Sequence, residues 1–274
     1  MSDAFRIGWF GGPAERRVRR ERPLDIDFES LCADAYPEPL VRAARAAWTF
    51  GAYQEYCSAA AFAALQSALL EAGAPIDLVA CAGSFVADEM LHVELNAQIA
   101  VALGGGISPP VDLAHVTPKV EGSPLERALT LAVRTCCVGE AFSLPVLAGT
   151  RACTTHPVIR AVLERIVRDE GPHSQLGWWI LEWARPDDAM RARLASVAQD
   201  ALRRHVEQLD RLPPDPVDPA DVHALGWMTA SEWAQAARTA IRASVIDPLA
   251  RHGIEVSSAS CGASSSSSSS SSVF

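Results

Sequence analysis

One pattern, Asp-Glu-x-x-His, occurs twice in this chain, as Asp88–His92 and as Asp169–His173. Residues three apart in an α-helix lie on the same face, so each copy can direct one carboxylate and one imidazole at a single point. Another glutamate precedes each copy at a helix-to-helix interval, Glu55 before the first and Glu140 before the second. Together these residues supply four carboxylates and two imidazoles, the ligand set of a carboxylate-bridged dinuclear metal site.

The spacing of these residues also indicates an internal repeat. The two motifs are 81 residues apart, and the two preceding glutamates are 85 residues apart. This suggests two helix hairpins related by a pseudo-twofold axis, each donating one glutamate and one Glu-x-x-His pair. The alternative is a polar core without a cation, but burying several charges of one sign together is costly. We therefore interpret the repeat as a metal site.

The predicted metal ligands are Glu55, Glu89, His92, Glu140, Glu170 and His173. We expect Glu89 and Glu170 to bridge the metals, although the pattern itself does not decide which glutamate bridges. Asp88 and Asp169 are each expected to accept a hydrogen bond from the ring N–H of a ligand histidine across the bundle. This hydrogen bond would fix the histidine tautomer. This hard, oxygen-rich set suits two iron ions, with manganese as the alternative, rather than zinc in a thiolate site.

Hydrophobic periodicity and helix breakers predict the elements that must position these ligands. Each ligand group falls near the middle of one helix; the four helices are predicted near residues 40–72, 76–103, 123–150 and 156–186. The proline-containing stretch 104–124 is too long for a tight helical hairpin and fits a crossover. The sequence therefore predicts an all-α, ferritin-like four-helix bundle with a long crossover between its second and third helices.

Three parts of the chain are predicted around this bundle. They are an N-terminal extension (1–37), a ferritin-like di-metal helical domain (38–255) and a disordered serine-rich tail (256–274). Additional C-terminal helices, the first near 188–211, are expected to pad the bundle. The arginine run at 16–22 is expected to form a solvated arm.

Pro172 lies inside the second motif, in the interior of the fourth predicted helix. A proline there removes one backbone hydrogen bond and crowds the carbonyl four residues back. We therefore expect a kink or a π-bulge at the metal.

Composition excludes several classes of function. The net charge of −9 argues against nucleic acid as the default partner, because phosphate binding favours a basic field. No run of 18 apolar residues occurs, so no membrane partner is expected. The seven cysteines contain no Cys-x-x-Cys pair, which favours reduced thiols in a cytoplasmic protein.

Over about residues 40–186 the chain resembles ferritin-like di-iron carboxylate proteins. The closest motif form is that of the p-aminobenzoate N-oxygenases; acyl-carrier-protein desaturases and ribonucleotide reductase small subunits use related forms. The resemblance implies a non-haem di-iron oxidase or oxygenase that activates dioxygen to oxidise a small organic or carrier-bound substrate, with a reductase or ferredoxin as electron donor. Ile166 stands where the N-oxygenases have an additional histidine ligand, so N-oxygenation is only one option.

Three alternatives remain open from the sequence, and one of them is a non-catalytic bundle that retains a structural metal. A rubrerythrin- or ferritin-like protein would handle iron or peroxide, although rubredoxin-type cysteine pairs are missing from the sequence. A manganese catalase would use the same kind of ligands with manganese and peroxide. The substrate and the oligomeric state, with a homodimer as one option, are also left open.

Overall fold

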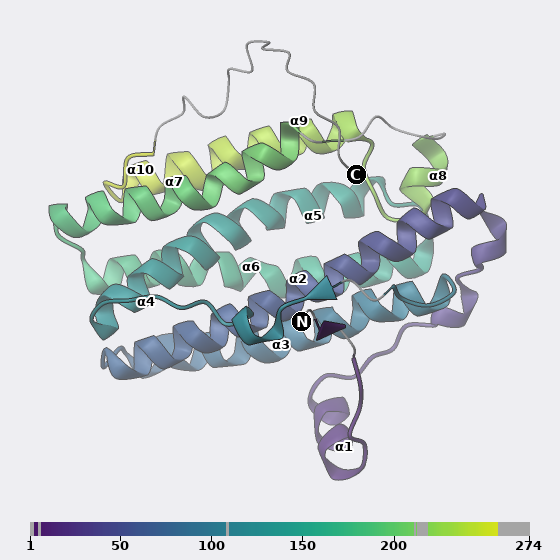
Figure 1. Ribbon diagram of the computed structural model, residues 1–274, viewed down its shortest axis with the longest axis horizontal. Helices are drawn as coiled ribbons and strands as arrows, with labels where there is room; N and C mark the ends of the chain where they lie inside the picture. Colours follow the sequence, from purple (N-terminus) through teal and green to yellow (C-terminus); the bar gives the residue numbers. More distant parts are fainter. Residues whose placement is uncertain (1–2, 5–6, 108–109, 211, 213–218, 257–274) are drawn as a thin grey trace.

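Four long helical segments build the molecule (Figure 1). The computed structural model describes residues 3–4, 7–107, 110–210, 212 and 219–256. The four segments are α2 (Glu38–Glu71), α3 (Ile76–Ala102), a continuous third helix made of α4 (Pro124–Ala132), η4 (Val133–Glu140) and α5 (Ala141–Cys153), and α6 (Pro157–Ala184). The prediction of an all-α chain is thus confirmed for the described residues, apart from a two-residue antiparallel pair, β1 (Asp3–Ala4) with β2 (Pro110–Val111).

The helix boundaries follow from local chemistry. Prolines precede or begin the long helices, where the missing N–H costs nothing. The third helix starts with a capping box, in which Ser123 accepts from the backbone of Glu126 and the Glu126 carboxylate accepts from the backbone of Ser123. Gly73, with φ +66°, forms the turn between α2 and α3, a conformation that glycine adopts without strain.

The four segments pack as a ring: α2 contacts α3 and α4, while α6 contacts α3, α4, η4 and α5. Two apolar clusters fill the ring. One contains Phe62, Phe85 and Leu176, and the other contains Trp48 and Ile166. Along α2, α3 and α6 the chain passes from one cluster to the other at Glu55, Glu89 and Glu170. The motif residues are therefore held between two apolar layers, where charges interact strongly.

The C-terminal helices form a second layer over the third helix, seen at the top of Figure 1. They are α7 (Asp188–Asp210), α8 (Pro219–Ala224), α9 (Ala230–Ala240), η5 (Ile241–Ile246) and α10 (Asp247–Arg251). The crossover from α3 to α4 carries β2 and the short helix η3 (Leu113–His115). Of the predicted serine-rich tail (256–274), Val256 is described and packs against the core, and residues 257–274 lie outside the described residues.

The N-terminal residues form a helix, α1 (Gly12–Glu21), and two short turns, η1 (Phe28–Ser30) and η2 (Ala33–Ala35). The expectation that the arginine run is solvated was wrong for Arg19 and Arg22. These two arginines make ion pairs with Glu94 and Asp88 of α3. A run of like charges reveals nothing about partners that lie far away in the sequence, so the pattern could not predict this docking.

The third helix contains the π-helical segment η4, which ends at Glu140. We expected a kink or a π-bulge at Pro172; α6 is an α-helix through that residue, so the π-bulge does not lie there. Pro172 and Arg168, whose carbonyl would lose its hydrogen bond, are both exposed, so water can replace the lost bond. The irregularity lies instead in the helix that carries Glu140.

Among the described helices, the run Pro124–Cys153 is the one long and apolar enough to cross a membrane, judged by length and composition. This run is the third helix of the ring, and more than half of its most apolar window is buried inside the protein. Core helices of soluble proteins pass the same test, so it is weak evidence for a membrane span.

Gly177 allows α6 to approach η4 closely. A Cβ atom at this position would lie 2.5 Å from Cys137 Sγ and 2.8 Å from Cys136 Cβ. We expect Gly177→Ala to lower the free energy of unfolding of the metal-free protein by about 1–3 kcal/mol, because the packed core must shift. Denaturant titration measures this change.

Gly139→Ala is the matched control, because an added Cβ on η4 itself would come no closer than 3.5 Å, to the carbonyl oxygen of Arg134, which is an ordinary van der Waals distance. Alanine has the higher helix propensity, so this variant is expected to be unchanged or stabilised by up to about 1 kcal/mol. Equal losses in both variants would contradict the close packing of α6 on η4.

Candidate metal centre

The structure brings the six candidate ligands to one level of the ring. Glu55 comes from α2, Glu140 from the end of η4, and α3 and α6 each contribute one Glu-x-x-His pair. Five of the six side chains are buried, and Glu55 is half-buried. The ligand atoms form two groups, in each of which all atoms lie within 4.8 Å of one another: Glu55, Glu89, His92 and Glu170, and Glu89, Glu140, Glu170 and His173.

Two carboxylates belong to both groups. Glu89 places Oε1 3.0 Å from His173 Nδ1 and Oε2 3.5 Å from His92 Nδ1. Glu170 places Oε1 3.1 Å from His92 Nδ1 and Oε2 3.2 Å from His173 Nδ1. Each carboxylate therefore offers one oxygen to each side of the cluster, which is the arrangement of a bridging ligand. The grouping leaves Glu55 beside His92 and Glu140 beside His173.

Each histidine presents Nδ1 to the carboxylates and Nε2 to an aspartate of the opposite motif. His92 Nε2 lies 3.6 Å from Asp169 Oδ2, and His173 Nε2 lies 3.7 Å from Asp88 Oδ2. These separations are longer than a hydrogen bond, but they put each aspartate on the outer side of a ring. A carboxylate in this place orients an imidazole and makes the nitrogen on its other side more basic.

Several buried polar atoms at the centre lack hydrogen-bond partners. Among the described residues, all but one of the buried side-chain nitrogen and oxygen atoms without a partner belong to Glu89, His92, Glu170 and His173. Buried polar groups are nearly always satisfied, and an unsatisfied cluster of this kind calls for an ion. The donor set, four carboxylates and two imidazoles, fits two divalent cations in charge and in chemistry.

Electrostatics support the same interpretation. Burial raises the pKa of Glu55 and of Glu140 well above the usual range, and neighbouring carboxylates raise it further. Burial alone would lower the pKa of His173, but contacts with Asp88, Glu170 and Glu89 raise it to about 12. Without metal ions the cluster therefore retains protons, and bound metal ions would replace them.

The rings around the centre fix its shape. Phe85 and Phe62 pack against His173, with ring centroids 4.2 Å and 5.2 Å from the imidazole centroid. Ile166 is buried in the apolar core and adds no ligand to the centre.

A cavity of about 910 Å³ reaches the centre from the side of the C-terminal helices. Its inner wall includes Glu55, Glu140 and Glu170, and its outer wall includes His205 of α7 and Trp233 of α9. His205 stacks on Phe142, with ring centroids 4.0 Å apart. The C-terminal helices, expected only to pad the bundle, thus also form one wall of a space large enough for a small organic molecule.

His205 carries the remaining buried atom without a partner, Nδ1. Burial lowers the pKa of this imidazole to about 4, so the ring is neutral near pH 7. A neutral imidazole with a free nitrogen in a cavity wall can form a hydrogen bond with a bound molecule. Sequence analysis missed His205 because it has no spacing relation to the motifs.

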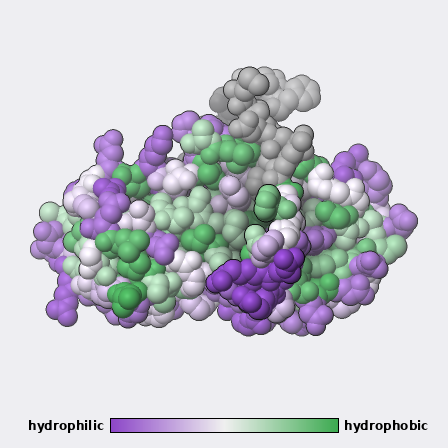
Figure 2. Space-filling model, turned by 90° about the horizontal axis from the view of Figure 1, so that it is seen from below, coloured by the Kyte–Doolittle hydropathy of each residue, from purple (hydrophilic) through white to green (hydrophobic). Residues whose placement is uncertain are grey.

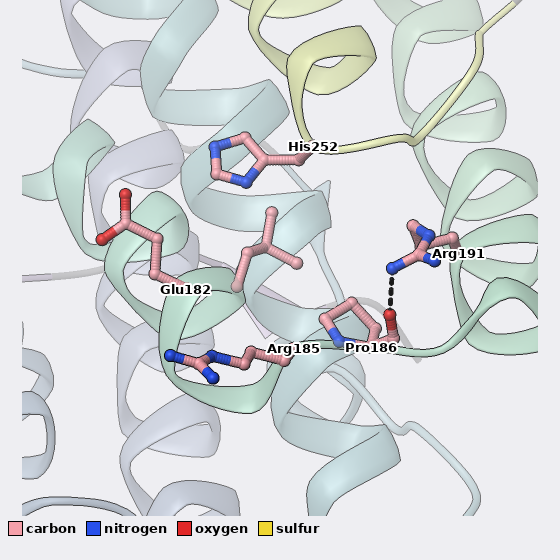
Figure 3. Close-up of a pocket in the computed structure, with 6 residues that line it drawn as sticks. Glu182, Arg185, Pro186, Arg191 and His252 are labelled. Carbon is pink, nitrogen blue, oxygen red and sulfur yellow. Dashed lines mark hydrogen bonds between the residues drawn. The ribbon is translucent and has the colours of Figure 1, made fainter.

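A second hollow, of about 490 Å³, lies at the C-terminal end of α6 (Figure 3). Glu182, Arg185 and His252 line it, and Arg191 donates a hydrogen bond to the carbonyl of Pro186. None of the six candidate ligands lines this hollow, so it is separate from the metal centre.

Comparisons with known proteins leave the function to be argued from this geometry. No family model matches the chain, and no curated protein matches it.

Proposed function

We propose that this protein is a non-haem di-iron oxidase or oxygenase with a ferritin-like bundle. The observation that carries the proposal is the sharing of Glu89 and Glu170 between two groups of ligand atoms, directly beside a cavity. In this assignment Glu55 and His92 would complete one metal position, and Glu140 and His173 the other. Glu89 and Glu170 would bridge them.

Charge balance supports a pair of divalent ions. Four carboxylates offset the charge of two such ions, so the loaded centre can stay buried between two apolar layers. Two iron ions, when bound, would supply the redox chemistry with dioxygen, and manganese remains the alternative. The aspartates beside the histidines would hold the imidazoles in place, and the two apolar layers shield the centre from water on the sides away from the cavity.

The size and position of the cavity favour a small organic molecule, or the end of a carrier-bound chain, as the substrate. It reaches three ligands, and the rest of its wall combines apolar and aromatic side chains, Phe142 and Trp233 among them, with polar ones such as Arg204 and His205. Oxidation with dioxygen also requires electrons, so a reductase or ferredoxin is the expected partner. The six cysteines of the described residues are free, in keeping with a cytoplasmic protein. A homodimer is compatible with this function.

The proposal is tested by metal analysis of protein purified without oxygen, followed by dioxygen addition to the reduced form. We expect about two irons per chain and a transient visible absorption band. Manganese together with rapid peroxide disproportionation would identify a catalase instead. Iron uptake into a cage, or peroxide consumption without an organic substrate, would identify the ferritin- or rubrerythrin-like alternative. A protein without any redox metal would contradict all three.

A further inference from the structure

The two aspartates beside the ligand histidines are supported in different ways. Asp169 accepts hydrogen bonds from Arg165 Nε at 2.7 Å and from Arg168 Nε at 3.2 Å, and both arginines lie on the same helix as Asp169. Asp88 accepts hydrogen bonds from Arg22 Nε at 3.1 Å and from Arg22 Nη2 at 2.9 Å. Arg22 follows α1, outside the four-helix ring. The sequence repeat makes the two motifs look equivalent, but the charges that support them are not.

The segment that carries Arg22 docks along α3. We call residues 7–22 the N-terminal arm. Arg19 donates to both carboxylate oxygens of the buried Glu94, one at 2.7 Å, and its guanidinium lies 4.3 Å from the ring centroid of Trp9. Arg22 Nη2 also donates to the carbonyl of Ser84 at 3.3 Å. Figure 1 shows α1 projecting below the bundle, and Figure 2 shows its hydrophilic side chains from below.

We infer that the N-terminal arm is part of the metal centre, and that Arg22 is a positioning residue which holds Asp88 against His173. The Asp88 side chain is mostly buried, and Arg22 supplies the fixed donors on the side away from the imidazole. Without those donors the Asp88 carboxylate is free to turn away from His173 Nε2. The imidazole then loses the partner that keeps its other nitrogen, Nδ1, directed at the candidate ligands. The other histidine keeps its support, because Arg165 and Arg168 do not belong to the arm.

This inference rests on the proposed metal centre but not on its reaction. Linkage also makes it reciprocal: if a docked arm favours metal binding, bound metal must favour the docked arm by the same factor. The arm contains several arginines at which trypsin can cleave, so its docking can be measured independently of metal affinity.

The test is anaerobic titration with Co²⁺ as a spectroscopic probe, in the full chain and in Arg22→Ala. We expect Arg22→Ala to weaken binding at one of the two positions by about 10–100-fold and to leave the other unchanged. Arg22→Lys keeps the charge but not the paired donors, so an intermediate affinity is expected. Metal should slow tryptic cleavage of the arm in the unaltered chain and have less effect in Arg22→Ala.

Arg19→Ala is the matched control. Arg19 lies on the same arm and binds α3 by a similar bidentate ion pair with Glu94. Unlike Asp88, Glu94 is not among the described groups that act on either ligand histidine. Unchanged metal affinity in Arg19→Ala, with weaker affinity in Arg22→Ala, supports the inference. Equal affinities in all variants, or equal losses in both alanine variants, would overturn it. If the unaltered chain bound no metal, the proposed function would fail instead, so the two failures are distinguishable.

Discussion

Glu89→Ala is expected to abolish binding of both metal ions. Glu89 offers Oε1 toward His173 and Oε2 toward His92, so its removal takes one ligand from each metal position at the same time. Glu55→Ala should behave differently, because Glu55 belongs to only one of the two groups. Metal analysis of purified variants should therefore find almost no metal in Glu89→Ala and about one ion per chain in Glu55→Ala.

Glu164→Ala serves as the control for this comparison. Glu164 lies on α6 but is exposed, and its ion pair among the described residues is with Arg160, at 3.6 Å. Exposed ion pairs contribute little to stability, so this variant should keep its full metal content. Equal metal loss in Glu55→Ala and Glu89→Ala would show that Glu89 does not bridge. Full occupancy in Glu89→Ala would contradict the site itself.

Metal loading is expected to stabilise the fold strongly. The metal-free centre buries carboxylates and imidazoles whose polar atoms lack hydrogen-bond partners, and such groups are costly. A metal that binds only the folded chain, present at about 1,000 times its dissociation constant, adds about 4 kcal/mol to the free energy of unfolding. Because 1 kcal/mol shifts the melting temperature of a chain of this size by roughly 2–4 °C, we expect an increase of roughly 8–16 °C.

Thermal unfolding with and without Mn²⁺, followed by circular dichroism at neutral pH, measures this shift. Mn²⁺ is used because it binds oxygen and imidazole ligands without reacting with air as readily as Fe²⁺ does. The matched control is Glu89→Ala, which should unfold at nearly the same temperature with and without the ion. A shift of similar size in Glu89→Ala would mean that the ion stabilises the protein elsewhere.

The sequence alone determined the helical architecture and the identity of the clustered residues. Alternation of apolar and polar residues at helical spacing predicted the four long helices, and their observed ends lie within about three residues of the prediction. The spacing of Glu89 with His92, and of Glu170 with His173, placed each pair on one face of one helix. These are local relations, set by the geometry of the α-helix, so they can be derived without knowing how the helices pack.

The π-helical segment shows where local reasoning fails. Pro172 is the obvious helix breaker, but it lies on an exposed face where the lost hydrogen bond matters little. The segment η4 contains no proline and packs closely against Gly177 of α6. Its irregular turn is a feature of how two helices meet, and the propensities of its own residues did not predict it.

Only the tertiary structure decided which groups meet across helices. Glu89 and Glu170 could be assigned to both metal positions only when their oxygen atoms were placed relative to both histidines. In the same way, Arg22 forms its hydrogen bonds with Asp88, which lies 66 residues further along the chain. His205 belongs to α7, outside the sequence repeat, and lines a cavity whose other wall contains candidate ligands. Sequence spacing fixes which side chains share a face of one helix. Distances between side chains on different helices depend on packing and on loops, which carry no comparable periodicity.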